Sequence, residues 1–194
     1  MNPGAEPRPT LRATTILCVR HGGKTAMAGD GQVSYGDLVL KSRASKLRVL
    51  GGGSVLAGFA GAAADAFALF DRFEQVLQAR EGDLTAAVVE MAKEWRLDKA
   101  MHRLDAVLLV ADTKRMVMLS GTGDVIEPDE PVLAIGSGGP YALAAARALL
   151  AHSSLGAEEV AREALAIAAD LCIYTNHSIQ VESLGTRAPR RKSR

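Results

Sequence analysis

Thr14 follows a proline-containing segment and opens a run of β-branched and apolar residues, and its hydroxyl could act as a nucleophile if this residue became the first of the chain. A threonine hydroxyl attacks a carbonyl only when a base removes its proton. A threonine at the start of a chain carries its own base, because a free α-amine has a pKa of about 7.7–8.0. This chemistry requires cleavage between Ala13 and Thr14, and a small Ala13 in a polar leader leaves that bond accessible. Alternatively, Thr14 simply begins a strand, and Thr15 is an adjacent rival.

Asp30 and Lys46 lie sixteen and thirty-two residues after Thr14 and could support such a nucleophile. A fixed ammonium near the amine would disfavour amine protonation and stabilise developing negative charge. A carboxylate beside Lys46 would hold this ammonium in place and keep it charged. Each residue also has a simpler explanation, since Asp30 lies in a Gly-Asp-Gly turn and Lys46 could extend to solvent from a strand start.

A glycine-rich loop around Ser137 precedes Pro140 and a helical pattern. Backbone N–H groups at a helix N-terminus bind anions, so the loop could hold a phosphate. However, the loop has no lysine and no P-loop spacing, and it lacks the first glycine of a nucleophile elbow. A phosphate-binding module that uses Gly136–Gly139 is kept as a weaker alternative function, which nucleotide titration would test.

The composition excludes several classes of protein. A net charge of +1 argues against a nucleic-acid binder that neutralises phosphates. The two cysteines, Cys18 and Cys172, do not form a secreted disulfide scaffold. No apolar run reaches the roughly 18 residues of a membrane helix, and residues 1–13 lack the apolar region of a signal peptide. We therefore expect a cytoplasmic protein, with an aliphatic core because only 4% of its residues are aromatic.

Other chemistry-bearing residues do not form a site by their spacing. The four histidines have no metal-ligand spacing among them. Cys172 lies in an apolar helical stripe and is more typical of a core residue than of a nucleophile. Asn176-His177-Ser178 fits a glycosylation sequon, which has no meaning without a secretory signal.

The elements that must position these residues occur in the order strands, two helices, strands, two helices, strand. Apolar and β-branched runs predict strands in two hairpins at 15–28 and 46–59, and later at 106–111, 115–119, 132–135 and 178–182. Helical spacing predicts helices at about 62–79, 83–104, 139–152 and 157–175. Asp83 is suited to cap the second of these helices.

Two packed sheets with a helical layer outside each would bury the apolar faces of these elements. The pattern alone establishes only an α+β fold. We expect one domain over residues 14–184, preceded by a disordered leader at 1–13 that is removed. The basic segment 185–194 is expected to be a flexible tail.

Several separated blocks resemble the HslV family, the peptidase subunits of bacterial HslUV proteases and relatives of proteasome β-subunits. The similarity extends from about Thr14 to Leu184, and its blocks are residues 13–20, 28–32, 58–61, 134–141 and 172–176. In that family the chain is cut before a threonine that becomes the nucleophile, which corresponds to Thr14 here. The resemblance implies a threonine endopeptidase for unfolded proteins. It also implies the four-layer αββα sandwich of the N-terminal-nucleophile hydrolases.

The resemblance also assigns roles to further residues and partners. Ser137 stands where the family has a serine that hydrogen-bonds the terminal amine, and the N–H of Gly58 stands where the family faces the oxyanion. No organic cofactor is implied, and ATP is used only by the partner, a hexameric HslU-type AAA+ ATPase. The subunits are expected to form two stacked hexameric rings. A non-catalytic ring subunit of the same fold is an alternative, although it would need none of Thr14, Asp30, Lys46 and Ser137.

The end of the last predicted helix is the expected site of a cation, namely sodium. The last carbonyls of a helix lack partners within the helix and lie at the negative end of its dipole. The resemblance implies a site at Ala169, Cys172 and Thr175. Hard cations prefer oxygen to sulfur, so Cys172 should bind through its carbonyl. A helix end capped by water is the alternative.

Overall fold

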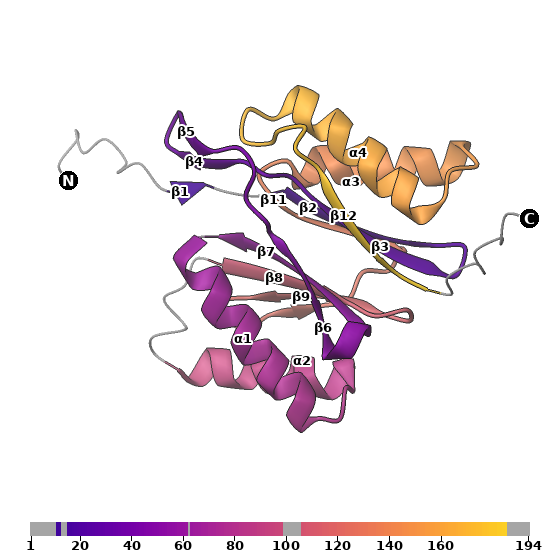
Figure 1. Cartoon of the computed structure of the whole chain (residues 1–194). Helices are drawn as coiled ribbons and strands as arrows, with labels where there is room; N and C mark the ends of the chain where they lie inside the picture. Colours follow the sequence, from indigo (N-terminus) through magenta and orange to yellow (C-terminus); the bar gives the residue numbers. More distant parts are fainter. Residues whose placement is uncertain (1–10, 13–14, 62, 99–105, 186–194) are drawn as a thin grey trace, which may run out of the picture.

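The computed structural model describes residues 11–12, 15–61, 63–98 and 106–185. Its centre is formed by two packed sheets, each covered on its outer face by a pair of helices (Figure 1). The predicted four-layer αββα arrangement is therefore confirmed. Thr14, most of the predicted leader and the predicted tail after Gly185 lie outside the described residues.

The first sheet has the strand order β11-β2-β3-β12, and all of its pairs are antiparallel. Its strands are β2 (Thr15–His21), β3 (Lys24–Gly29), β11 (Val132–Gly136) and β12 (Gln180–Leu184). The predicted hairpin of β2 and β3 turns at Gly22 and Gly23, which both have positive φ angles that favour glycine. The helices α3 (Gly139–His152) and α4 (Ala157–Leu171) cover this sheet (Figure 1).

The second sheet has the order β10-β9-β8-β7-β6. Its strands are β6 (Leu47–Leu50), β7 (Val55–Gly61), β8 (Ala106–Ala111), β9 (Met116–Ser120) and β10 (Val125–Ile126), and a short 3₁₀ turn, η1 (Gly51–Gly53), links β6 to β7. The helices α1 (Ala63–Ala79) and α2 (Leu84–Leu97) cover it. As predicted, the Asp83 side chain caps α2 by accepting hydrogen bonds from two backbone N–H groups of its first turn.

β2 shows why the apolar runs are continuous rather than alternating. Leu17 and Val19 belong to the core beneath α3 and α4. Ile16 and Cys18, on the other face, belong to the core between the two sheets. A strand that is buried on both faces needs apolar side chains at every position. Burial also raises the pKa of the Cys18 thiol to about 12, so this cysteine is unreactive near neutral pH.

A three-stranded sheet in the order β1-β4-β5 was not predicted. It consists of β1 (Leu11–Arg12), β4 (Val33–Tyr35) and β5 (Leu38–Lys41). All four residues of β5 are exposed, so this strand has no buried face whose pattern the sequence could reveal.

The ends of two predicted helices were wrong. The helix expected to reach residue 104 ends at Leu97, and residues 99–105 lie outside the described part of the chain. The helix expected to reach Thr175 ends at Leu171, and Cys172 is its extended C-cap. Tertiary contacts explain the earlier end of the helix. The Ile173 carbonyl accepts a hydrogen bond from Gln32, just after β3, and the Thr175 hydroxyl bonds to that of Thr15 at the start of β2.

Candidate active site at the start of β2

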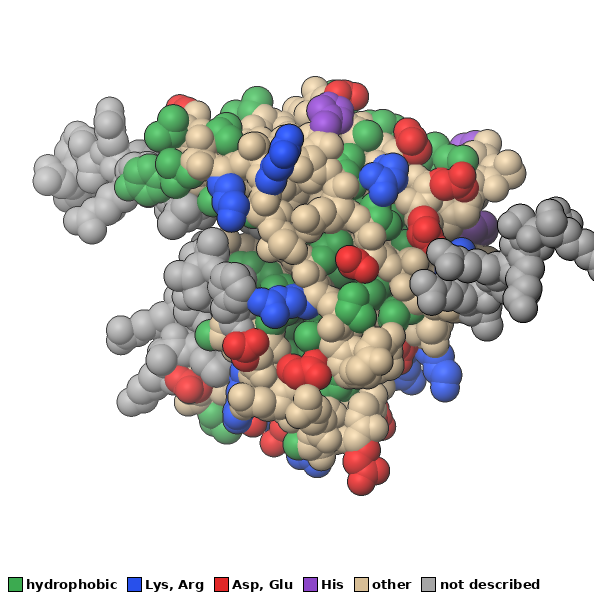
Figure 2. All heavy atoms as spheres, in the orientation of Figure 1, with side chains coloured by type: hydrophobic (Ala, Val, Ile, Leu, Met, Phe, Trp, Pro, Cys, Tyr) green, Lys and Arg blue, Asp and Glu red, His purple; other side chains and the backbone are tan. Residues whose placement is uncertain are grey.

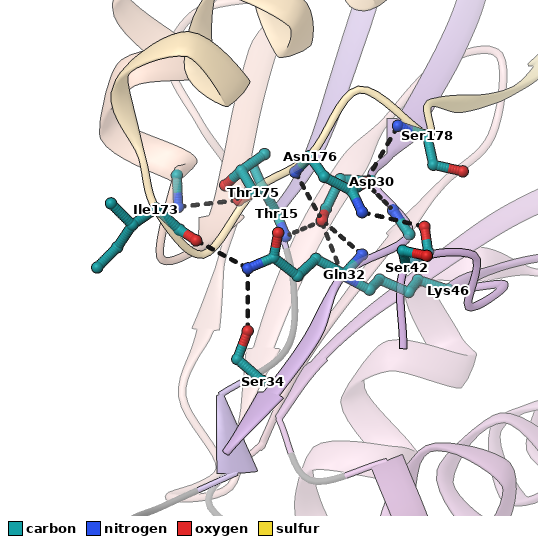
Figure 3. A network of polar contacts seen from close by, with 12 residues as sticks. Thr15, Asp30, Gln32, Ser34, Ser42, Lys46, Ile173, Thr175, Asn176 and Ser178 are labelled. Carbon is teal, nitrogen blue, oxygen red and sulfur yellow. Dashed lines mark hydrogen bonds and ion pairs between the residues drawn. The ribbon is translucent and has the colours of Figure 1, made fainter. Parts of the chain in front are cut away.

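Asp30 lies at the centre of the candidate site, directly after β3, and is almost fully buried. Its Oδ1 accepts hydrogen bonds from the backbone N–H of Thr15 at 2.8 Å and from Nζ of Lys46 at 2.7 Å. Its Oδ2 accepts from the backbone N–H groups of Gln32 at 2.8 Å and Asn176 at 3.3 Å. Figure 3 shows these donors converging on the carboxylate from separate segments. The carboxylate is thereby held in one position.

Lys46 lies in the irregular segment before β6 and is 6% exposed. The pKa of Lys46 lies below its usual 10.5 because burial disfavours the charged form, while the charge and hydrogen bond of Asp30 oppose that shift. The backbone carbonyl of Lys46 accepts a hydrogen bond from the N–H of Phe59 in β7 at 3.3 Å. The structure thus brings Asp30 and Lys46 into one buried ion pair whose lysine is anchored to the second sheet.

Thr14 lies outside the described residues, so its role as nucleophile stays a prediction. The backbone nitrogen of Thr15, through which the chain joins residue 14, is the one that Asp30 holds. The Thr15 hydroxyl accepts from the N–H of Gly138 at 2.9 Å and lies 2.7 Å from the Thr175 hydroxyl. Thr15 is fully buried, and a hydroxyl enclosed in this way cannot reach a substrate. The structure therefore argues against Thr15 as the rival nucleophile.

Ser137 is half-buried and lies between β11 and α3. The pairing of β11 with β2 ends where Gly136 lies opposite Thr15, and Ser137 directly follows Gly136 in the chain. A Cβ at Gly138 would lie 2.5 Å from the hydroxyl oxygens of both Thr15 and Thr175, so only glycine fits there. The N–H of Gly138 is already used by Thr15, which leaves the loop with fewer donors for a phosphate.

Gly58 lies in the middle of β7, where it pairs with Leu47 on one side and Leu109 on the other. A Cβ at Gly58 would lie 2.7 Å from Cγ2 of Ile16 and 2.9 Å from Sδ of Met27. The close approach of the two sheets therefore explains a glycine at this position. Its predicted role as the oxyanion donor stays a prediction.

Sequence reasoning missed two polar side chains that tie the site together. The Nε2 of Gln32 donates to the Ser34 hydroxyl at 2.9 Å and to the Ile173 carbonyl at 2.7 Å. The Asn176 side chain bonds to backbone groups on both sides of the ion pair (Figure 3). Their places in the sequence could have indicated them, because Gln32 lies two residues after Asp30 and Asn176 directly follows Thr175, and both neighbours were already candidate site residues.

The residues predicted to bind a cation lie around the end of α4. Ala169 is in the last turn of the helix, Cys172 caps it, and the Cys172 carbonyl accepts a hydrogen bond from the N–H of Thr175 at 3.0 Å. The Thr175 hydroxyl contacts Thr15. Within the described ranges, no group of three or more His, Cys, Asp or Glu side chains could hold a metal ion. The site was predicted to use backbone oxygens, and it stays a prediction. In the same ranges, no helix has the length and apolar character needed to cross a bilayer.

The fold and the site can now be compared with known proteins. The profile of the proteasome subunit family matches residues 10–184. The ATP-dependent protease subunit HslV of Pseudothermotoga lettingae is 54% identical over 173 residues, which are 89% of this chain and 98% of the relative. The crystal structure of eukaryotic HslV from Trypanosoma brucei superposes with a TM-score of 0.84 at 43% identity, covering 89% of this chain and 100% of that one.

Thiobacillus denitrificans BPH, solved in complex with epoxomicin, has a TM-score of 0.69 at 24% identity and covers 90% of this chain and 100% of its own. At that identity the likeness concerns the fold alone. The family profile and the two HslV relatives each span most of the chain. The chain therefore belongs to the proteasome subunit family and, within it, to the HslV protease subunits.

Proposed function

We propose that the chain is the threonine-type endopeptidase subunit of an ATP-dependent protease. The observation that carries this proposal is the buried carboxylate of Asp30, which bonds both the Thr15 nitrogen at 2.8 Å and the Lys46 ammonium at 2.7 Å. A structural subunit would have no need for a buried lysine paired with a carboxylate, because desolvation of an ammonium is unfavourable. Because the bonded Thr15 nitrogen joins the chain to residue 14, the ion pair lies where its ammonium could act on the α-amine of Thr14.

In the proposed mechanism, Oγ of Thr14 attacks the carbonyl carbon of a peptide and its proton passes to the α-amine of Thr14. The new C–O bond forms, the peptide C–N bond breaks, and the amine gives the proton to the leaving nitrogen. Water then hydrolyses the ester by the reverse proton path and restores the free hydroxyl. The ammonium of Lys46 disfavours protonation of the amine and stabilises negative charge in the transition state, and Asp30 holds that ammonium.

Ser137 is proposed to hydrogen-bond the α-amine of Thr14. Its support is its place directly after the pair of Gly136 and Thr15. The N–H of Gly58 is proposed as the donor to the tetrahedral oxyanion, by resemblance to the family. Its packing against Ile16 and Met27 is an independent reason for a glycine there, so substitution of Gly58 cannot by itself test the catalytic role.

We also propose that the subunit acts in the cytoplasm within two stacked hexameric rings, to which a hexameric HslU-type ATPase delivers unfolded proteins. Support comes from the names of the HslV relatives and from surface that a lone chain leaves exposed. Leu38, Val39 and Leu40 in β5 are each more than half exposed. Figure 2 shows hydrophobic side chains gathered in the region where Figure 1 draws β4 and β5. Contiguous exposed apolar surface is typical of an interaction site.

A sodium ion bound by the carbonyls of Ala169, Cys172 and Thr175 is part of the proposal. The donor set suits a hard cation, because the chain leaves α4 at Cys172 and its last carbonyls need partners. The Cys172 carbonyl accepts one hydrogen bond, and a carbonyl has a second lone pair. Such an ion would hold the segment that carries Thr175 and Asn176, with no part in the bond-making steps.

The deciding experiment concerns Thr14. We expect intact-mass measurement of the purified protein to show loss of residues 1–13, and Thr14→Ala to abolish hydrolysis of a fluorogenic peptide while assembly is kept. Thr14→Ser is the matched control, because it retains a hydroxyl and should retain activity. Addition of the ATPase with ATP should stimulate the wild type. A full-length chain that is active, or an active Thr14→Ala, would refute the mechanism, and an inert processed wild type would favour the non-catalytic ring subunit.

A further inference from the structure

The Asn176 side chain connects the two segments that carry the ion pair. Its Oδ1 accepts hydrogen bonds from the backbone N–H of Gly31 at 3.2 Å and from that of Ser178 at 3.1 Å. Its Nδ2 donates to the backbone carbonyl of Ser42 at 3.0 Å. Gly31 directly follows Asp30, and Ser42 lies in the segment that leads to Lys46. One amide thus bonds to the residue that follows Asp30 and to a residue four positions before Lys46 (Figure 3).

The two connected segments are in direct contact at Gly31. The Gly31 carbonyl accepts a hydrogen bond from the N–H of Ala44 at 2.9 Å. A Cβ at Gly31 would lie 2.5 Å from the Ser42 carbonyl oxygen and 2.9 Å from Cα of Arg43, so the contact requires glycine. It would also lie 3.1 Å from Cβ of Ser178, so three segments meet at this point.

The backbone around these contacts has little regular structure of its own. Residues 43–46 belong to neither a helix nor a strand, and the same is true of residues 30–32. Asp30 and Lys46 each bond to their own sheet, through the Thr15 carbonyl and the Phe59 N–H, but β3 and β6 belong to different sheets, so strand pairing does not fix the distance between the two residues. The side-chain amide of Asn176 and the close contact at Gly31 link the two segments directly and constrain that distance. The backbone N–H of Asn176 adds to it by donating to Oδ2 of Asp30 at 3.3 Å.

We propose that Asn176 is a positioning residue that sets the geometry of the Asp30–Lys46 pair and, through it, the rate of peptide hydrolysis. This inference rests on the proposed function only for its catalytic consequence. Asparagine suits the role because its amide supplies an acceptor and a donor on one short side chain. Alanine removes both, and serine can accept from the Ser178 N–H but does not reach Ser42.

The first test is kinetic and uses the processed full chain with a fluorogenic peptide. We expect Asn176→Ala to lower kcat about 10- to 100-fold, because small misplacement of catalytic groups has effects of that order. KM should stay within about twofold, because both polar atoms of the Asn176 amide are engaged by backbone groups and the change acts on the chemical step. Asn176→Ser should lower kcat by an intermediate factor. If Asn176→Ala does not fold, the kcat of Asn176→Ser serves as the test.

The matched control is His177→Ala, in the adjacent residue. The exposed His177 side chain pairs with Asp170 at 3.0 Å, away from the ion pair of the site. This variant should keep kcat within about twofold of the wild type. A loss of activity in His177→Ala as large as in Asn176→Ala would mean that any change in this segment disturbs the site, and the specific role of Asn176 would be refuted.

The second test does not depend on peptidase activity. Amide hydrogen exchange should become about tenfold faster in peptides covering residues 30–34 and 42–46 of Asn176→Ala, because the part-buried bond to Gly31 and the exposed bond to Ser42 are lost. A tenfold change corresponds to about 1.4 kcal/mol. Peptides from α1 should be unchanged. Faster exchange in a chain whose wild type cannot hydrolyse peptides would keep the positioning role and refute the proposed function. Unchanged exchange and unchanged kcat in either folded Asn176 variant would overturn the inference.

Discussion

The two helical halves of the molecule have cores of different kinds. The half with α1, α2 and β6–β10, here called the aromatic half, buries large side chains that include Phe59, Phe70, Phe73 and Trp95. The half with α3, α4 and the strands β2, β3, β11 and β12, here called the alanine-rich half, has a core of small residues. Its buried alanines are Ala26, Ala28, Ala142, Ala146, Ala157, Ala161, Ala164 and Ala168. Small side chains allow the backbones of neighbouring elements to approach closely.

The candidate site lies at one end of the alanine-rich half. Thr15, Asp30, Gly138 and Thr175 all lie in this half or at the ends of its elements, and their contacts require short distances between backbones. Lys46 is the exception, because it reaches the site from the segment before β6 in the other sheet. From this comparison we infer that the aromatic half mainly contributes to the stability of the fold, and that the alanine-rich half mainly fixes the positions of the site residues.

The largest expected effect is a loss of stability in the aromatic half. Phe73→Ala should lower the free energy of unfolding by about 3–5 kcal/mol, because it removes a fully buried ring and leaves a cavity. Urea denaturation of the full chain measures this. Val89→Ala on α2 is the control, since that side chain is 45% exposed and should cost much less. Below its unfolding transition, Phe73→Ala should still have near-normal kcat. A specific loss of kcat there would contradict the division between the halves.

A change at Lys46 should have the opposite pattern, with activity lost and the fold kept. We expect Lys46→Ala to lower kcat by about 10²–10³-fold, the cost of removing one group that stabilises transition-state charge. Lys46→Arg should not restore it, because a planar guanidinium cannot replace a compact ammonium beside Asp30. Wild-type turnover in Lys46→Ala would show that the lysine has no catalytic use.

The pH profile of the wild type offers a further check on Lys46. Its ammonium is fully present below the folded-state pKa and is lost as the pH rises through that value. Because burial lowers the pKa of Lys46, the alkaline loss of activity should have its midpoint below 10.5. A midpoint at or above 10.5 would contradict a buried, functional lysine.

A smaller effect is expected from overpacking the alanine-rich half. Ala164→Leu places extra methylenes between α4 and its sheet, where Ala164 is fully buried, and should cost about 1–3 kcal/mol of stability. Since α4 leads into Thr175 and Asn176, kcat should fall more than it does in Phe73→Ala when both variants are folded. Equal kcat values for the two variants would remove the claimed difference between the halves.

The order of elements and an α+β fold could be predicted from the residues, because two-sided burial gives continuous apolar strands and one-sided burial gives helical stripes. The four-layer arrangement was predicted by resemblance. Asp30 and Lys46 were selected by their spacing from Thr14 and by resemblance. The end of α4 could not be predicted, because residues 168–172 all suit a helix and the contacts that end it are tertiary. Nor could the role of Asn176, because a single sequence does not reveal that it meets Gly31 and Ser42. The exposed strand β5 carries no alternating pattern.

The smallest expected effect concerns Cys172 and the proposed sodium ion at the end of α4. If the ion is held by carbonyl oxygens, the thiol is not a ligand, because hard cations prefer oxygen to sulfur. Cys172→Ser should therefore keep both activity and its dependence on sodium within about twofold, since the backbone that forms the site is unchanged. Peptide hydrolysis is titrated with sodium chloride against choline chloride at constant ionic strength. A wild type with no response to sodium would argue for a helix end capped by water. A folded Cys172→Ser that loses the response would make the thiol the ligand and carbonyl coordination wrong.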